Sequence, residues 1–225
     1  PTIAESLSHA FVRFPGPTAE LHGLGGLAGG GSSFALGVNS VGEVVGYATT
    51  TTGVSHAVLW RANGVLVDLG ASSSGESIAL GINDSGQVVG WMGNGSRRQP
   101  FIWTETSGVQ IIGGIKDGTA FAINKSGVVV GESNGRPISW NAGSTASLLL
   151  LRKYDFGGRA HAISDAGEMV GYSSGCDDFY YYFDEDCNAV EHPVMWTVVE
   201  EAKDLRKIGS AATVATALGI NSAHQ

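Results

Sequence analysis

The segment bounded by the chain's two cysteines, Cys-Asp-Asp-Phe-Tyr-Tyr-Tyr-Phe-Asp-Glu-Asp-Cys at residues 176–187, gathers side chains that can recognise a sugar. The rings of Tyr180, Tyr181 and Tyr182 offer flat faces for the C–H side of a sugar ring. The carboxylates of Asp177 and Asp178 can accept hydrogen bonds from its hydroxyls. We therefore predict a ligand-binding surface here. A solvated acidic loop is the alternative.

The same segment carries candidates for calcium, an ion that binds oxygen ligands. These candidates are Asp184, Glu185 and Asp186. The run lacks the alternating ligands and the central glycine of an EF-hand loop. Calcium is therefore a secondary expectation, and no other metal or cofactor is expected.

Cys176 and Cys187 are the only cysteines of the chain. Two thiols that flank one loop predict a disulfide and hence an oxidising compartment. A pair of free thiols is the alternative. A metal site is less favoured, because no second cysteine pair or histidine cluster stands beside them.

Two polar residues, Arg159 and His161, stand where the chain otherwise places mostly apolar ones. Sister phrases carry Leu36, Leu80, Phe121 and Leu218 at the position of His161, and Phe34, Ile78, Thr119 and Thr216 at that of Arg159. An arginine and a histidine there predict a polar ligand-binding pocket. The alternative is a locally hydrated channel with a satisfied histidine. No residue is assigned a catalytic role.

The phrase that holds His161 is one of five copies, which defines the elements around it. The copies occupy residues 34–48, 78–92, 120–133, 160–173 and, cut short, 217–225. A second phrase, such as Ser-His-Ala-Val-Leu-Trp at residues 55–60, lies between them. Five copies in 225 residues give about 45 residues each, the length of a four-stranded propeller blade.

Each copy contains the signals of four short strands. A small apolar strand ends in Asn-x-x-Gly, which is typical of a hairpin turn, and Val-Val-Gly follows as the second strand. No segment shows a 3.6-residue period over a helix length. We predict an all-β chain that forms one five-bladed β-propeller domain over residues 1–225. Its C-terminal first strand would pair with N-terminal strands of the same blade, and the blade units would be 217–225 with 1–30, 31–75, 76–116, 117–156 and 157–213.

Other motifs are interpreted as structural. Gly-Tyr-Ser-Ser-Gly at residues 171–175 matches a nucleophile elbow around Ser173, but no helix follows it. The recurring His9, His56 and His192, like the asparagines of the turns, fit hydrogen bonding within the blades. The recurring tryptophans fit the core between blades.

Composition excludes two classes of partner. The formal net charge of −8 argues against nucleic acid and against a polybasic membrane contact. No run approaches the roughly 18 apolar residues of a membrane span, so no membrane insertion is expected. The first residues lack the regions of a signal peptide, so any such peptide is expected to have been removed already. The oligomeric state is left open.

The repeated phrase, followed by His9-Ala10-Phe11 or His56-Ala57-Val58, resembles the HAF-repeat family of bacterial extracellular proteins. That resemblance implies a secreted, periplasmic or cell-surface protein, and it brings no general catalytic assignment. Five blades of this size also resemble tachylectin-type lectins in architecture. The expected function is ligand binding, with carbohydrate or a cell-surface glycan as the partner. The alternatives are a glycan-active enzyme that uses the channel mouth and a structural or adhesive repeat that binds proteins.

Overall fold

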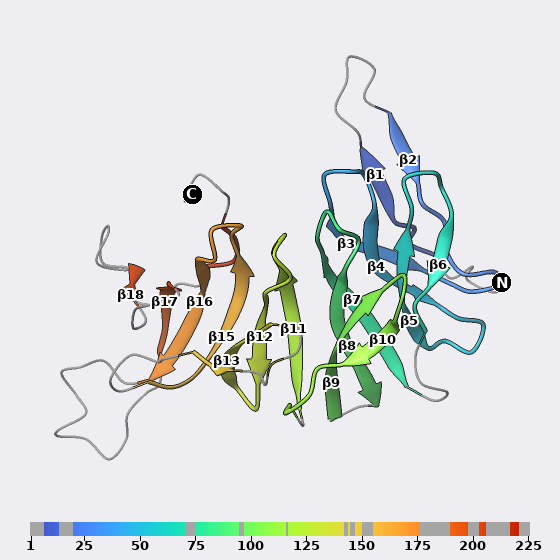
Figure 1. The fold of residues 1–225 in the computed structure, drawn as a ribbon. Helices are drawn as coiled ribbons and strands as arrows, with labels where there is room; N and C mark the ends of the chain where they lie inside the picture. The colour runs from blue at the N-terminus through green and yellow to red at the C-terminus, as the bar shows by residue number, and fades with distance from the viewer. Residues whose placement is uncertain are drawn as a thin grey trace. The chain divides into compact units, whose positions relative to one another are not determined.

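The computed structural model describes residues 7–13, 20–70, 75–94, 97–115, 117–141, 144, 147–149, 155–175, 190–197, 203–205 and 217–220. These residues form antiparallel β-sheets, and no α-helix occurs among them (Figure 1). The prediction of an all-β chain is confirmed. The chain divides into two compact units, Pro1–Ile111 and Ile112–Gln225, which are described separately.

The first unit holds one two-stranded and two four-stranded sheets. Strands β1 (Phe11–Arg13) and β2 (Leu21–Gly23) pair with each other. The next sheet contains β3 (Ser33–Val38), β4 (Val44–Thr49), β5 (Ser55–Trp60) and β6 (Leu66–Asp68). The last contains β7 (Glu76–Ile82), β8 (Val88–Asn94), β9 (Arg97–Thr104) and β10 (Gly108–Ile111).

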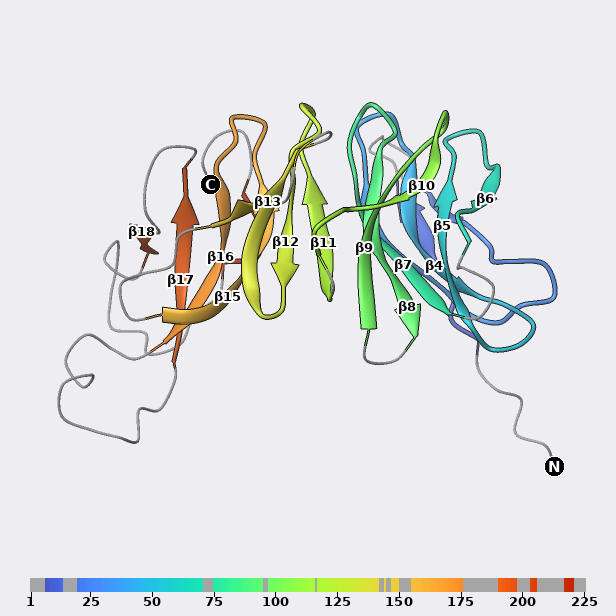
Figure 2. The ribbon, with the colours of Figure 1, turned by 60° about the horizontal axis from the view of Figure 1, so that its bottom comes forward.

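The second unit holds two four-stranded sheets. One contains β11 (Gly118–Ile123), β12 (Val129–Ser133), β13 (Arg136–Trp140) and β14 (Ser147–Leu148). The other contains β15 (Asp155–Ile163), β16 (Met169–Gly175), β17 (Val190–Trp196) and β18 (Lys203–Asp204). In every four-stranded sheet the strands lie side by side in chain order (Figure 2).

The Asn-x-x-Gly phrases form the hairpin turns that join the first and second strands of three four-stranded sheets, and Ser164-x-x-Gly167 forms that turn in the fourth. The side-chain oxygen of Asn39 accepts a hydrogen bond from the Glu43 amide at 2.8 Å, and Gly42 has a φ of 86°. The side chain also reaches the neighbouring sheet, where the amide of Asn39 donates to the carbonyl of Asn83 at 3.2 Å. In the second unit, Asn124 donates to the carbonyl of Ser164 in the same way. The asparagines therefore fasten one sheet to the next.

Each first strand contains a bulge that explains the repeated Val-Val-Gly. Pairing of β3 with β4 shifts by one residue between Ala35 and Gly37, so Leu36 is the extra residue. Opposite the bulge, a Cβ on Gly46 would lie 1.9 Å from the carbonyl oxygen of Phe34. Only glycine leaves room for that backbone. Equivalent shifts recur in β7, β11 and β15.

A buried serine joins neighbouring sheets in the first unit. The hydroxyl of Ser77, on β7, accepts from the amide of Ala57 at 2.8 Å and donates to the carbonyl of Gly70 at 3.0 Å. Ser33 makes the same two bonds with Ala10 and Gly25.

The copies that lack this serine also lack its donor. Pro100 and Pro137 stand at the repeat position of Ala57, and Gly118 and Gly158 stand at the position of Ser77. Proline has no amide hydrogen to donate. The serine and the alanine are therefore lost together, which explains why the third-strand phrase changes from His-Ala to x-Pro.

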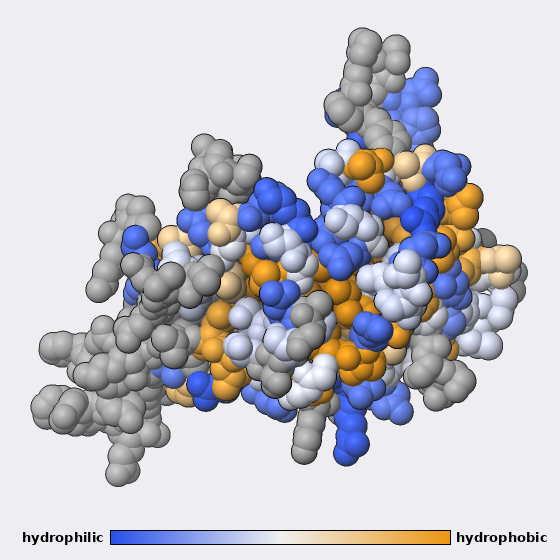
Figure 3. All heavy atoms as spheres, viewed as in Figure 1, coloured by the Kyte–Doolittle hydropathy of each residue, from blue (hydrophilic) through white to orange (hydrophobic). Residues whose placement is uncertain are grey.

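The core lies between sheets that are neighbours in the chain. Val45, Leu59, Ala79 and Phe101 are buried together in the first unit, as β7 packs on β3, β4 and β5. In the second unit the corresponding cluster includes Trp196. Other apolar residues stay exposed on the first unit, among them Phe34, Leu36 and Val38. Hydrophobic and hydrophilic residues alternate over the visible surface (Figure 3).

Candidate functional site

Arg159 and His161, predicted as ligand-binding residues, lie on β15 and face a small cluster of polar and aromatic side chains in the second unit. The Nε atom of Arg159 donates to Oε2 of Glu132 on β12 at 2.7 Å. The Arg159 side chain is 44% exposed and that of Glu132 is 14% exposed. The cation therefore remains accessible to a ligand, while its carboxylate partner is mostly covered.

His161 is the extra residue of the bulge in β15, because pairing with β16 shifts between Ala160 and Ala162. Bulges of this kind commonly change the direction of a side chain next to a site. The imidazole ring lies 5.1 Å from the ring of Phe121 and 5.8 Å from that of Tyr172, centroid to centroid. It thus lies near two aromatic rings, one from β11 and the other from β16.

The surroundings shift the titration of two groups of this cluster. Burial lowers the pKa of His161, and the positive charge of Arg159 lowers it further. Burial raises the pKa of Tyr172. Glu132 and Glu191 oppose the shift of the His161 pKa and add to the shift of the Tyr172 pKa, while Arg159 opposes the shift of the Tyr172 pKa. At neutral pH the site therefore presents a neutral imidazole, a phenol that keeps its proton and an exposed guanidinium.

The equivalent positions of the first unit have a different chemistry. Phe34, at the repeat position of Arg159, stacks on Tyr47 with ring centroids 4.9 Å apart. In the next sheet the guanidinium of Arg98 lies 4.3 Å from the ring centroid of Trp91. Among the parts of the chain that the structure describes, the combination of Arg159, Glu132 and His161 occurs in the second unit alone.

Sequence reasoning missed Glu132, Tyr172 and Glu191. Glu132 had a signal in the sequence, because it stands where other copies carry Tyr47, Trp91 and Tyr172. A carboxylate in a series of aromatic residues is a departure of the same kind as Arg159. Glu191 follows the insertion and had no comparable signal.

The rest of the predicted site lies outside the described residues. These residues are Cys176, Asp177, Asp178, Tyr180, Tyr181, Tyr182, Asp184, Glu185, Asp186 and Cys187. The disulfide and the calcium site stay predictions. The strands at both ends of the insertion are described, and Gly175 and Val190 pair there. No group of three or more His, Cys, Asp or Glu residues that could hold a metal ion occurs in the described ranges.

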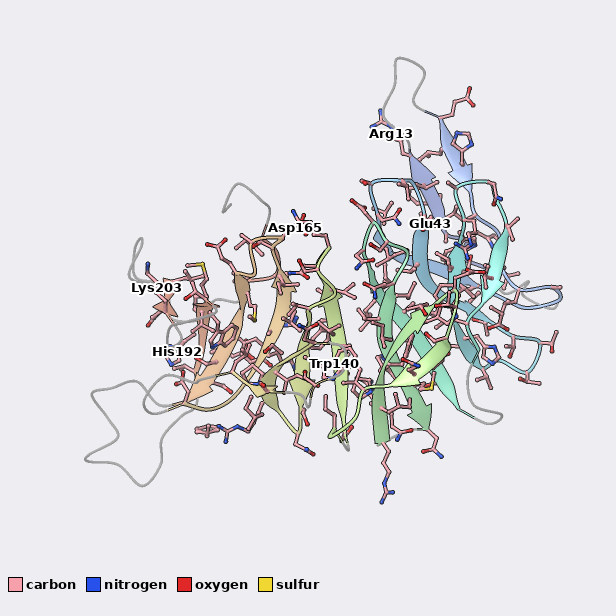
Figure 4. All side chains as sticks on the ribbon, in the orientation of Figure 1. Arg13, Glu43, Trp140, Asp165, His192 and Lys203 are labelled. Atoms are coloured by element: carbon pink, nitrogen blue, oxygen red, sulfur yellow. The ribbon has the colours of Figure 1, made fainter. Side chains whose placement is uncertain are left out.

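Ser173, the central serine of the elbow-like motif, is buried within a sheet. It has no exposed surface, and its hydroxyl donates to Oδ2 of Asp155. The other oxygen of Asp155 lies 3.9 Å from Nε2 of His192, which is also fully buried (Figure 4). Ser173 and His192 are cross-strand partners on β16 and β17, but the serine hydroxyl donates to Asp155 rather than to the histidine, so the arrangement is not that of an activated nucleophile. The interpretation of this motif as structural agrees with the geometry.

Comparison with protein-family models finds no match to this chain. No curated protein matches it either. Among the described residues, no helix is long and apolar enough to cross a membrane. The site must therefore be interpreted from its own geometry.

Proposed function

We propose that this protein is a carbohydrate-binding β-propeller whose ligand contacts Arg159, His161 and Tyr172. The observation that carries the proposal is an exposed guanidinium, held by Glu132, beside a histidine ring that lies near two aromatic rings. Planar polar groups fix the hydroxyls of a sugar, and aromatic faces pack on its C–H groups. A location outside the cytoplasm, as in the HAF-repeat proteins that the chain resembles, belongs to the same proposal.

The five-bladed architecture is also a proposal, supported by repetition within each unit. Asn39 donates to the next sheet in the first unit, and Asn124 does so in the second. Asn221 occupies the same place in the C-terminal phrase. In a closed propeller its side chain would find the carbonyl of Asn39, and residues 217–220 would add the first strand to the blade of β1 and β2.

Deletion of residues 217–225 tests closure. We expect loss of the native monomer, seen as unfolding or as oligomers in light scattering after size-exclusion chromatography. The variant Asn221→Ala keeps the strand and should show a smaller effect. A deletion variant that remains a monomer with unchanged thermal stability would contradict the closed propeller.

A glycan array tests the function, with the intact protein beside His161→Leu and Arg159→Thr. Both substitutions place residues that sister copies carry at these positions, so the strand should form. Phe34→Leu in the first unit is the control. Binding by the intact protein and the control, with loss in both site variants, is the expected result. Absence of binding to any glycan would remove the proposal and favour a protein-binding repeat.

One observation favours an enzyme as the second candidate. The pKa of His161 is lowered, and Glu132 and Glu191 are close enough to influence it. A neutral imidazole near carboxylates can act in proton transfer. Glycans that bind on the array are therefore incubated with the protein and followed by mass spectrometry. Turnover that is lost in His161→Leu would support an enzyme, and unchanged glycans would support binding alone.

A further inference from the structure

A second candidate pocket lies in the second unit at the end of β13, around Trp140, which Figure 4 labels. The cavity has a volume of about 230 Å³. This is smaller than the roughly 300–1,000 Å³ of sites for drug-sized ligands. It shares no lining residue with the cluster at Arg159 and His161. Its size suits one small ring.

The residue before the tryptophan of β13 is Ser139, where the other four-stranded sheets carry the larger apolar residues Leu59, Ile102 and Met195. In the first unit Leu59 pairs with Val67 across β5 and β6, and Leu59 is fully buried. The equivalent pair across β13 and β14 is Ser139 with Ser147. Two small hydroxyl residues replace two branched apolar ones, and both serines line the cavity.

Trp140 is more exposed than the tryptophans of the other copies. The tryptophans at its repeat position, Trp60, Trp103 and Trp196, are 1%, 8% and 1% exposed. Trp140 is only half-buried. Its indole Nε1 donates to the carbonyl of Ser144 at 2.9 Å. The Ser144 hydroxyl in turn donates to the carbonyl of Asn141 at 2.7 Å, so the ring is fixed before any ligand arrives.

Three polar side chains of the pocket are uncharged and can bind a ligand. Within the described ranges, the side chains of Ser139, Asn141 and Ser147 make no hydrogen bond to the protein. Apolar atoms of Met169 complete the wall. The lining residues that the structure describes are all uncharged. Hydroxyl and amide groups beside an indole are suited to a neutral ring that carries several hydroxyls.

We propose that this pocket binds a single neutral pyranose or cyclic polyol, with the ring against Trp140 and its hydroxyls on Ser139, Asn141 and Ser147. Small sites of this kind bind in the millimolar range. The proposal does not rest on the function of the Arg159 cluster. A protein with both sites would contact two separated parts of one glycan or two different glycans.

The test follows the indole N–H signals of the ¹⁵N-labelled full chain, which has 5 tryptophans. Trp140→Phe assigns the signal of Trp140. The probes are glucose, galactose, mannose, N-acetylglucosamine and myo-inositol, titrated to the order of 100 mM because millimolar binding is expected. At least one probe should shift the Trp140 signal with saturation. If no probe shifts it, the proposal is overturned.

Two variants define the site. The double variant Ser139→Leu/Ser147→Val installs the residue pair that already packs in β5 and β6, and it should weaken the titration at least tenfold. The other indole signals show whether the double variant folds. If it does not, Asn141→Ala, a substitution in a turn, is the second variant that should weaken binding. Equal binding in the intact protein and in the folded variants would contradict the assignment.

Arg159→Thr/His161→Leu separates this pocket from the proposed glycan site. We expect its Trp140 titration to match that of the intact protein, whatever the glycan array shows. Loss of the titration in this variant would place the ligand at the other cluster and overturn the proposal for Trp140.

Discussion

Removal of one hydroxyl at Ser77 should weaken the join between the two four-stranded sheets of the first unit. Ser77 has no exposed surface, and its hydroxyl satisfies the Ala57 amide and the Gly70 carbonyl. A buried group left without a hydrogen bond costs about 1–3 kcal/mol. The hydrogen bond from the Ala57 amide is buried, and the hydrogen bond to the Gly70 carbonyl is part-buried. We therefore expect Ser77→Ala to lower the free energy of unfolding by about 3 kcal/mol.

The repeat itself supplies the compensating change. Pro137 and Gly158 stand at the positions of Ala57 and Ser77 in the second unit. In the first unit the Ala57 carbonyl accepts from the Leu69 amide, and in the second unit the Pro137 carbonyl accepts from Leu149, so the local backbone is the same. Ala57→Pro removes the donor that Ser77→Ala leaves unsatisfied. In the Ser77→Ala background it should recover about 2 kcal/mol.

Urea denaturation of the four proteins of this double-mutant cycle measures the coupling. Ala57→Pro alone should destabilise, because the Ser77 hydroxyl loses its donor. The reasoning is refuted if Ser77→Ala costs less than about 1 kcal/mol, or if Ala57→Pro has the same effect in both backgrounds. Ser107→Ala, at an exposed turn, is the control for a serine without a buried role.

Three further perturbations test the turns, the site and the buried carboxylate. Asn39→Asp should lower the free energy of unfolding by about 2 kcal/mol at pH 7, because the new carboxylate would face the Asn83 carbonyl and the Glu43 carboxylate, which both accept from the amide in the parent protein. Acidification below about pH 4 should reduce the difference from the parent. The pKa of His161 is lowered in the folded protein, so stability should fall as the pH decreases below the ordinary pKa of about 6.5 and level off below the folded pKa. His161→Leu should remove that part of the pH dependence in thermal unfolding, and a profile identical to that of the parent would contradict the prediction. Asp155→Ala should lower the free energy of unfolding by roughly 3–5 kcal/mol, more than Ser173→Ala, because the Asp155 side chain is 1% exposed and also faces His192. Equal losses of stability for the two variants in urea titrations would exclude a role for the histidine contact.

The strands and their turns were accessible from the sequence because they rest on local chemistry. Asn-x-x-Gly determines a hairpin through the asparagine side chain and a glycine with positive φ, and Gly42 has that conformation. The apolar phrases on both sides then become paired strands. Packing between neighbouring sheets also follows from the repeat, because one four-stranded sheet of this size cannot bury both of its faces.

The candidate site was accessible only in part. His161 was found because it replaces an apolar series, and Arg159 because it introduces a charge where the other copies carry Phe34, Ile78, Thr119 and Thr216. Glu132 reaches Arg159 from another sheet of the same unit, and that contact depends on packing between sheets rather than on spacing along the chain. The bulge that directs His161 was not expected, although the glycine opposite each bulge was visible as Val-Val-Gly.

The exposure of Trp140 shows a different limit. Four copies carry tryptophan at this position, and all four were interpreted as core. Three are buried. The exception is Trp140, which is half-buried. Burial depends on the side chains that neighbouring strands bring against a residue, which a comparison of single positions along the chain does not reveal.

The serine that joins β5, β7 and the loop between β6 and β7 has a consequence for how such chains can be rearranged. Ala57, Gly70 and Ser77 must stay together, although Ala57 and Ser77 belong to different sheets. A segment exchanged between copies should therefore run from a third strand to the second strand of the next sheet. Its natural crossover points are the connections between second and third strands, which range from the two residues between Ser133 and Arg136 to the long insertion between Gly175 and Val190. Chimaeras joined at these connections should fold. Chimaeras joined at sheet boundaries would place glycine at the Ser77 position opposite alanine, or serine there opposite proline, and so break the matched pair at a buried contact.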